Sequence, residues 1–185
     1  MITTFQTIGR DHKGERMSRL YLLRHARAAW PDPGMNDFDR PLTDAGVSQT
    51  TELSAHMHEA GLAPSVIICS TARRARETWR KLAEGLLVAE DDAIFDNELY
   101  TGDASDYVAI MRRHGTDGPV MIVGHNPMME DTSEALAPVG KKSALSRLQS
   151  GFSTCGLAII DFDEPLDEAS PGTGRLTDFI VPARA

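Results

Sequence analysis

Short apolar runs alternate with helix-type segments along most of the chain, and this alternation is the feature that most constrains the fold. Strand-type runs cover residues 19–23, 66–69 and 120–123, with a weaker run near 93–95 and two closing runs at 156–162 and 176–181. Segments 43–60 and 72–86 carry apolar side chains at helical spacing. This order predicts an α/β protein of three layers, in which helices flank a central, mostly parallel sheet.

The length of the chain suits one compact domain. It has 185 residues, of which 41% are hydrophobic, enough for a buried core. Residues 1–18 are polar, contain two glycines and show no sustained period, which predicts a poorly ordered N-terminal extension. The predicted domain therefore comprises residues 19–185.

Charge and hydropathy exclude several classes of protein. The net charge of -8 argues against a nucleic-acid-binding surface, and no apolar run is long enough to cross a bilayer. The first residues lack the apolar block of a secretory signal, and Cys69 and Cys155 lie in apolar contexts typical of free, buried thiols. These features predict a cytoplasmic protein with neither nucleic-acid nor membrane partners.

Three of the predicted strands end in groups that suit a phosphate. The first run leads into Arg24 and His25, the second into Ser70 with Arg74 one helical turn later, and the run 120–123 into His125. Ligands of open α/β sheets bind beyond the carboxyl ends of the strands. We therefore expect these side chains to meet in one pocket, which is also what an acidic protein needs in order to attract an anion locally.

The residue types at these strand ends match the demands of phosphoryl transfer. That reaction needs an in-line nucleophile and positive charge around the three equatorial oxygens. A neutral imidazole can attack phosphorus near neutral pH, whereas a serine would need a separate base. Guanidinium groups stay charged and donate in a planar fork that fits phosphate oxygens.

Four segments together carry a family resemblance. These are Leu23-Arg24-His25-Ala26, Arg40-Pro41-Leu42-Thr43 with Gly46, the run Ser70 to Thr78, and Val123-Gly124-His125-Asn126-Pro127. In this order they resemble the histidine phosphatase superfamily, with its phosphoglycerate mutase-like fold, and most of all its small SixA-like phosphohistidine phosphatases. The resemblance runs from about residue 19 to residue 181.

The resemblance implies a role for each matching residue. It makes His25 the phosphorylated nucleophile, and Arg24, Arg74 and His125 its phosphate-binding partners. Arg74 takes this role because it lies four residues after the serine and four before the threonine of its motif, which leaves Arg73 and Arg76 as surface or rim charges. Alanine and threonine replace the usual glycine and proline at positions 26 and 71, and neither change removes a reactive group.

The proton donor is less closely defined by the resemblance. One branch of the superfamily has a glutamate after the third strand, and Glu98 lies at about that place. Another branch has an aspartate directly after the second histidine, where this chain has Asn126. Glu98 is therefore the candidate donor, and an ordinary surface carboxylate is the alternative.

No metal site or organic cofactor is expected. His56 and His58 are two residues apart on a helix, so they do not share a face. Asp32, Asp37 and Asp39 lack the spacing of a calcium loop and predict a solvated turn.

The predicted function is a phosphohydrolase that works through a phosphohistidine on His25. A short segment between the second and third strands leaves little chain for a lid, so an open pocket and a phosphohistidine-bearing protein partner are expected. A small-molecule phosphomonoesterase and a non-catalytic phosphate-binding module are the alternatives.

Overall fold

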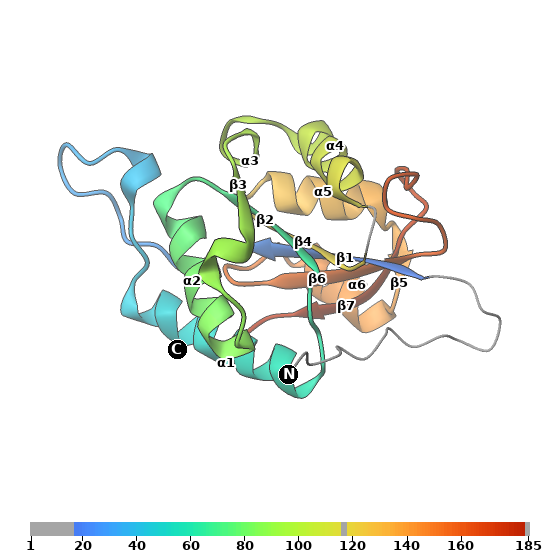
Figure 1. Ribbon diagram of the computed structural model, residues 1–185, viewed down its shortest axis with the longest axis horizontal. Coiled ribbons are helices and arrows are strands. Elements are labelled where there is room, and N and C mark those ends of the chain that lie inside the picture. Colours follow the sequence, from blue (N-terminus) through green and yellow to red (C-terminus); the bar gives the residue numbers. More distant parts are fainter. Residues whose placement is uncertain (1–16, 116–117, 184–185) are drawn as a thin grey trace.

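Seven strands form one sheet in the part of the chain that the structure, a computed structural model, describes: residues 17–115 and 118–183 (Figure 1). The strands are β1 (Ser18–Arg24), β2 (Val66–Ser70), β3 (Ala93–Asp96), β4 (Val120–Gly124), β5 (Val139–Gly140), β6 (Leu157–Phe162) and β7 (Arg175–Ile180). Their order is β3-β2-β4-β1-β6-β7-β5. The first four strands of that order are mutually parallel, and β6 runs antiparallel to both β1 and β7.

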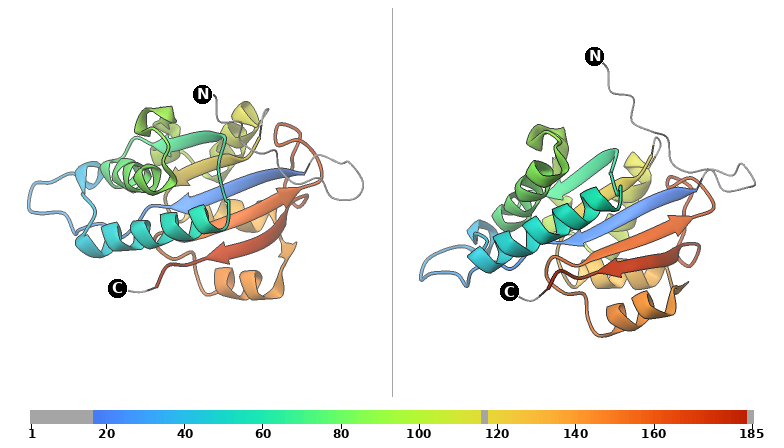
Figure 2. Two further views of the ribbon diagram at one scale, coloured as in Figure 1. Left: turned by 60° about the horizontal axis from the view of Figure 1, so that its bottom comes forward. Right: turned by 90° about the horizontal axis from the view of Figure 1, so that it is seen from below.

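Helices cover both faces of this sheet (Figure 2). They are α1 (Asp44–Glu59), α2 (Arg73–Leu86), α3 (Glu98–Thr101), α4 (Ala104–His114), α5 (Met128–Leu136) and α6 (Lys142–Gln149), with 3-10 turns η1 (Asp37–Asp39) and η2 (Glu90–Asp92). Helices α1 and α2 pack on one face, whereas α4, α5 and α6 pack on the other. The predicted three-layer α/β fold is thus confirmed.

The two cores follow from alternation along the buried strands. In β1, Leu20 and Leu22 contribute to the core under α4, α5 and α6, while Tyr21 and Leu23 contribute to the core under α1 and α2. Successive side chains of a strand point to opposite faces, so a strand buried on both sides is apolar throughout. This explains why the central strands lack a polar-apolar alternation in the sequence.

The start of α1 is where the sequence predicts it. Thr43 is the N-cap, and its side chain accepts a hydrogen bond from the Gly46 backbone at 3.1 Å. Gly46 lies so close to the carbonyl of Arg27 that a Cβ there would be 2.2 Å from its oxygen. Only glycine allows this approach, which ties the start of α1 to the loop that follows β1.

Three features at the C-terminal side differ from the prediction or extend it. Asn126 followed by Pro127 in the sequence predicts a helix capped by Asn126, whereas α5 begins at Met128 with Pro127 as its N-cap. The Asn126 side chain instead donates to Glu130, at 3.0 Å. Helix α6 and the two-residue β5 were not predicted; both are short, and α6 buries only Ala144 and Leu148.

Other expectations fall at or beyond the limits of the described residues. The proposed N-terminal extension lies outside them, except for Met17 and Ser18, and Ser18 is the first residue of β1.

Cys69 and Cys155 are both free and buried, as the sequence predicts. Within residues 17–115 and 118–183, no helix is both long and apolar enough to cross a membrane.

Candidate active site

The parallel register of β1, β2 and β4 brings the three predicted strand ends together. Arg24 pairs with Gly124, and Cys69 pairs with Val123, so the residues that follow these pairs emerge at one edge of the sheet. The backbone amide of His25 continues the ladder by donating to the Gly124 carbonyl at 3.0 Å. The rings of His25 and His125 then lie with their centroids 5.0 Å apart.

The contacts of His25 define which of its nitrogen atoms carries a lone pair. Nδ1 lies 2.8 Å from the carbonyl oxygen of Ala26, which can only accept, so Nδ1 donates. Arg74 Nε donates to His25 Nε2 at 3.2 Å, which requires a lone pair on Nε2. Both contacts agree with one neutral tautomer, in which Nε2 carries the lone pair that a nucleophile needs.

Arg74 reaches this position because it lies in the first turn of α2. It is buried, and besides Nε its Nη1 donates to the backbone carbonyl of Asp37 at 2.7 Å. Its Nη2 lies 3.0 Å from the Asp37 carboxylate. The guanidinium is therefore fixed between the nucleophile candidate and the 3-10 turn η1.

His125 is held by β2 and by α4. Its Nε2 lies 2.8 Å from Ser70 Oγ, and its backbone amide donates to the hydroxyl of Tyr107 at 3.2 Å. His125 Nδ1 is buried and has no partner among the described residues. Arg24 Nε is in the same state, and buried polar atoms without partners are characteristic of ligand sites.

Burial and neighbouring arginines keep both histidines neutral. Burial is the largest of the effects that lower the pKa of His25 to about 3; the hydrogen bond to the Ala26 carbonyl opposes it, and the charges of Arg74 and Arg24 reinforce it. Burial is likewise the main effect that lowers the pKa of His125 to about 3, and the neighbouring His25 and Arg74 act in the same direction. The lone pair on His25 Nε2 thus persists well below neutral pH.

The ring-nitrogen NMR signals of His25 and His125 should show this directly. Between pH 8 and pH 5 they should stay at the positions of neutral imidazole, because the folded-state pKa values lie below this range. An unfolded chain has imidazoles with a pKa near 6.5 and binds more protons, so both histidines should also lower the stability as pH falls from about 6.5 towards 3. A titration midpoint near 6.5 for His25 would contradict the expectation.

Asp37 is a site residue that the sequence analysis misses. The turn is exposed, as predicted, but the Asp37 carboxylate also accepts from Arg40 at 2.8 Å and from the Tyr100 hydroxyl at 3.1 Å, in addition to the Arg74 contact. The hydrogen bond from Arg40 is the largest of the effects that hold its pKa below the ordinary value. Nothing in the sequence around Asp37 indicates these contacts, because Asp37 and Arg40 lie in a loop segment without a regular period.

Glu98 is the one predicted residue that the structure does not join to the others. It begins α3, and its exposed carboxylate lies 3.4 Å from Arg113 of α4. Tyr100, two residues later, points to the site instead, with its ring edge-on to His125 at 5.6 Å. The turn of α3 therefore presents Tyr100, and not the Glu98 carboxylate, to the histidine pair.

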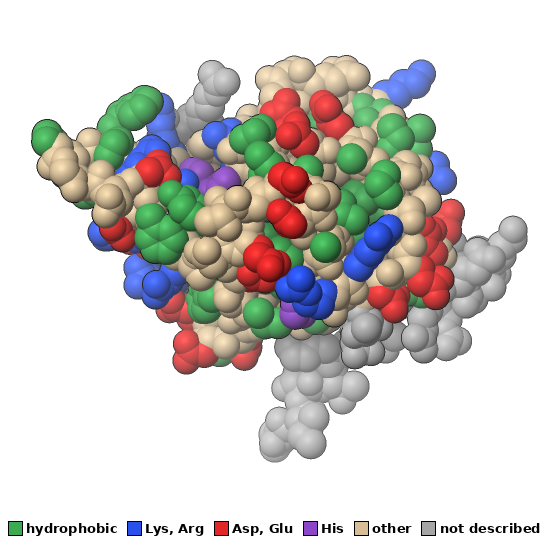
Figure 3. Space-filling view, turned by 90° about the horizontal axis from the view of Figure 1, so that it is seen from above, with side chains coloured by type: hydrophobic (Ala, Val, Ile, Leu, Met, Phe, Trp, Pro, Cys, Tyr) green, Lys and Arg blue, Asp and Glu red, His purple; other side chains and the backbone are tan. Residues whose placement is uncertain are grey.

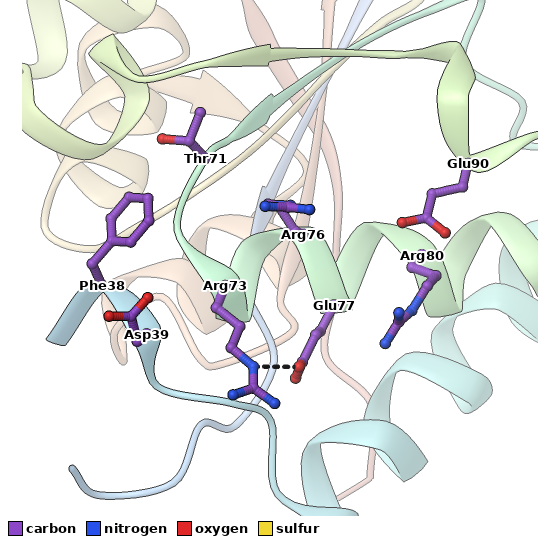
Figure 4. A pocket seen from close by; sticks show the side chains of 8 residues that line it. All are labelled: Phe38, Asp39, Thr71, Arg73, Arg76, Glu77, Arg80 and Glu90. Atoms are coloured by element: carbon purple, nitrogen blue, oxygen red, sulfur yellow. Dashed lines mark hydrogen bonds and ion pairs between the residues drawn. The ribbon is translucent and has the colours of Figure 1, made fainter. Parts of the chain in front are cut away.

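Two neighbours of Arg74 line a separate cavity, which Figure 4 shows. This cavity of about 300 Å³ is lined by Arg73, Arg76 and Arg80 of α2, together with Phe38, Asp39, Thr71, Glu77 and Glu90. Arg73 is paired with Glu77 at 2.7 Å, and Arg76 lies over the ring of Phe95. Both arginines are exposed, so the structure separates them from Arg74 as the sequence motif predicts.

The site opens at the surface. On the face shown in Figure 3, histidine side chains are visible between basic and acidic side chains, near the loop after β1, which projects at the left. The residues described by the structure contain no cluster of three or more histidine, cysteine or acidic side chains placed to bind a metal ion. Positive charge at the site comes from Arg24, Arg74 and Arg40.

Comparison with known proteins identifies the family. Residues 20–113 match the model of the histidine phosphatase superfamily (branch 1). The chain is 30% identical over 163 residues to the uncharacterized protein Rv1276c of Mycobacterium tuberculosis, which covers 86% of this chain and 99% of the relative.

Two solved structures show the same arrangement of elements. A candidate phosphohistidine phosphatase SixA from Agrobacterium tumefaciens is 34% identical, with a TM-score of 0.74 over 89% of this chain and 99% of that one. The protein histidine phosphatase SixA complexed with tungstate is 20% identical and shares the fold, with a TM-score of 0.72 over 89% and 97% of the two chains. The chain therefore belongs to the histidine phosphatase superfamily, branch 1, and is a SixA-like phosphatase.

Proposed function

We propose that this phosphatase removes the phosphoryl group from phosphohistidine on a protein, through a covalent phosphohistidine on its own His25. The observation that carries the proposal is the neutral His25 ring, whose Nε2 lone pair is fixed beside Arg74 at an open edge of the sheet. The 34% identity to a candidate phosphohistidine phosphatase supports the substrate class.

The architecture around the site also favours a phosphate presented by a protein. The chain segments after β2 and β3 are taken up by α2, α3 and α4, and α2 and α4 pack on the sheet. The described residues of these segments that lie outside the helices form only short connections, which are too short to enclose a small substrate. A phosphoryl group on a protein side chain can approach such an open site.

The proposed reaction has two steps. His25 Nε2 attacks phosphorus in line, so that a P–N bond to His25 forms as the bond to the substrate's imidazole nitrogen breaks, and that nitrogen takes up a proton. Water then attacks the phosphorus of phospho-His25, which restores the imidazole and releases inorganic phosphate. Arg24, Arg74 and His125 are proposed to bind the equatorial oxygens and to stabilise their charge best in the transition state.

A substrate panel tests this function. kcat/KM should be measured for a phosphohistidine protein, nitrophenyl phosphate and phosphoglycerate with the same enzyme preparation. The proposal expects the phosphohistidine protein to be the best substrate. A clear preference for phosphoglycerate would instead indicate a small-molecule phosphomonoesterase, and no turnover of any of the three would indicate a binding module.

The role of Glu98 as proton donor remains a prediction, and leaving groups of different basicity test it. If Glu98 protonates a departing alkoxide, Glu98→Gln should slow alkyl phosphates roughly 100- to 10,000-fold, because an alkoxide is a poor leaving group. Nitrophenyl phosphate should be slowed far less, since its phenolate leaves without a proton. Asp37→Asn is the comparison: because Asp37 contacts Arg74, its loss should slow all substrates alike, without regard to the leaving group. An equal, small effect on all substrates would make Glu98 a bystander.

A further inference from the structure

Arg24 is a partly buried cation whose side chain makes no direct ion pair with any described residue. Its Nη1 donates to the backbone carbonyl of Phe152, and its Nε has no partner. Arg74 differs, since Asp37 already occupies both of its terminal nitrogens. Something other than an ion pair must therefore orient the Arg24 guanidinium.

Glu130, in the first turn of α5, binds the backbone of Phe152, whose carbonyl accepts the hydrogen bond from Arg24. Its Oε2 accepts hydrogen bonds from the backbone amide of Phe152 at 3.3 Å and from Asn126 Nδ2 at 3.0 Å. Asn126 Nδ2 also lies 3.5 Å from the Phe152 carbonyl. The carboxylate thus fixes both the loop before β6 and the residue after His125.

We propose that Glu130 is a positioning residue of the phosphatase: it anchors the backbone at Phe152, and the Phe152 carbonyl in turn orients Arg24 towards the phosphate. The proposal rests on the proposed role of Arg24 in binding the phosphoryl group. Phe152 is well suited to transmit this constraint, because its ring is buried against Phe179 at 4.9 Å and its amide and carbonyl bind Glu130 and Arg24, respectively.

This arrangement supplies a counter-charge without blocking the guanidinium. Burial lowers the pKa of Arg24, and the negative charge of Glu130 works against that shift. A carboxylate bound directly to Arg24 would compete with phosphate for the same donors, as Asp37 must at Arg74. Acting through Phe152, Glu130 leaves the remaining donors of Arg24 free.

Glu130→Ala, compared with Glu130→Gln and Glu134→Ala, tests the positioning role. Glu134 is an exposed residue one turn further along α5, and its substitution controls for the loss of a carboxylate from this helix. Glu130→Ala should raise the KM for nitrophenyl phosphate and the Kd for inorganic phosphate about 10- to 100-fold, the range found when supporting partners of metal ligands are removed. kcat should change less, and Glu130→Gln, which keeps an acceptor for Phe152 and Asn126, should recover most of the affinity.

The sign of the effect separates positioning from simple electrostatics. Removing a negative charge near a phosphate would tighten binding if Glu130 acted only through its field. Tighter or unchanged phosphate binding in Glu130→Ala would therefore overturn the proposal. If the alanine variant does not fold, Glu130→Asp keeps the charge but is too short to hold both donors, and the same loss of affinity is expected from it.

A double-mutant cycle with Arg24→Ala tests whether Glu130 acts through Arg24. In the Arg24→Ala background, the substitution of Glu130 should have almost no further effect on the Kd for inorganic phosphate. Additive effects would overturn the inference but leave the role of Arg24 intact. Unchanged phosphate binding in Arg24→Ala alone would instead contradict the proposed role of Arg24 itself.

Discussion

His25→Ala should abolish turnover, with a loss on the order of 10⁴-fold or more, the scale at which other covalent enzymes lose activity without their nucleophile. The reason is the geometry of Nε2, which is unprotonated, half-buried and fixed by Arg74. Neither Ser70 nor Thr71 could replace it: Thr71 donates to Asn97, which is not a base, and Ser70, although hydrogen-bonded to His125, is fully buried and cannot reach a substrate. Phosphate binding should survive better than turnover in this variant, since the arginines remain.

Chemical trapping distinguishes a nucleophile from a binding residue. Rapid quenching of the wild-type enzyme with labelled substrate should leave an acid-labile, base-stable phosphoryl group on His25. His58→Ala is the matched control, because it removes an exposed imidazole on α1, far from the sheet edge that carries the site. Wild-type turnover by His25→Ala, or label on another residue, would refute the central assignment.

Arg74→Ala should reduce kcat/KM by about 10²- to 10³-fold, the usual cost of removing one preorganised donor from a developing negative charge. Arg74 is the arginine that contacts His25, the proposed nucleophile, and it is almost fully buried. In that setting a positive charge interacts strongly with a phosphoryl group, because little water screens it. Arg74→Lys should restore only part of the activity, since an ammonium group cannot contact His25 and a phosphate oxygen in the same planar geometry.

Arg73→Ala and Arg76→Ala are matched controls on the same helix. Their side chains are exposed, and they line the neighbouring cavity shown in Figure 4. Each should change kcat/KM for nitrophenyl phosphate by less than about threefold, as expected for screened charges outside the pocket. Equal losses in all three variants would mean that the register of the arginine motif is misassigned.

The order of motifs at the strand ends was predictable from the sequence for a physical reason. Central parallel strands are buried on both faces, so they read as continuous apolar runs, and the polar group that follows each run must lie at the edge of the sheet. This rule points to His25, to His125 and to the segment that contains Arg74, and the resemblance to the family motif selects Arg74 over Arg73 and Arg76. The α/β fold follows from the same runs and from the helical periods between them.

Contacts between side chains from distant segments needed the tertiary structure. Asp37 lies in a loop without periodicity, and its contact with Arg74 spans 37 residues, so no local pattern indicates it. Glu130 reaches Phe152 across 22 residues, and the direction of Glu98 depends on Arg113 of another helix.

The sequence by itself thus determined which side chains lie at the carboxyl ends of the central strands, because burial and strand alternation are properties of neighbouring residues along the chain. Only the tertiary structure decided how these groups are oriented: the tautomer of His25, the partner of each arginine and the direction of each carboxylate. The physical reason is that a hydrogen bond needs its donor and acceptor placed to within a few tenths of an ångström, and no local period encodes such a placement for residues far apart in the chain.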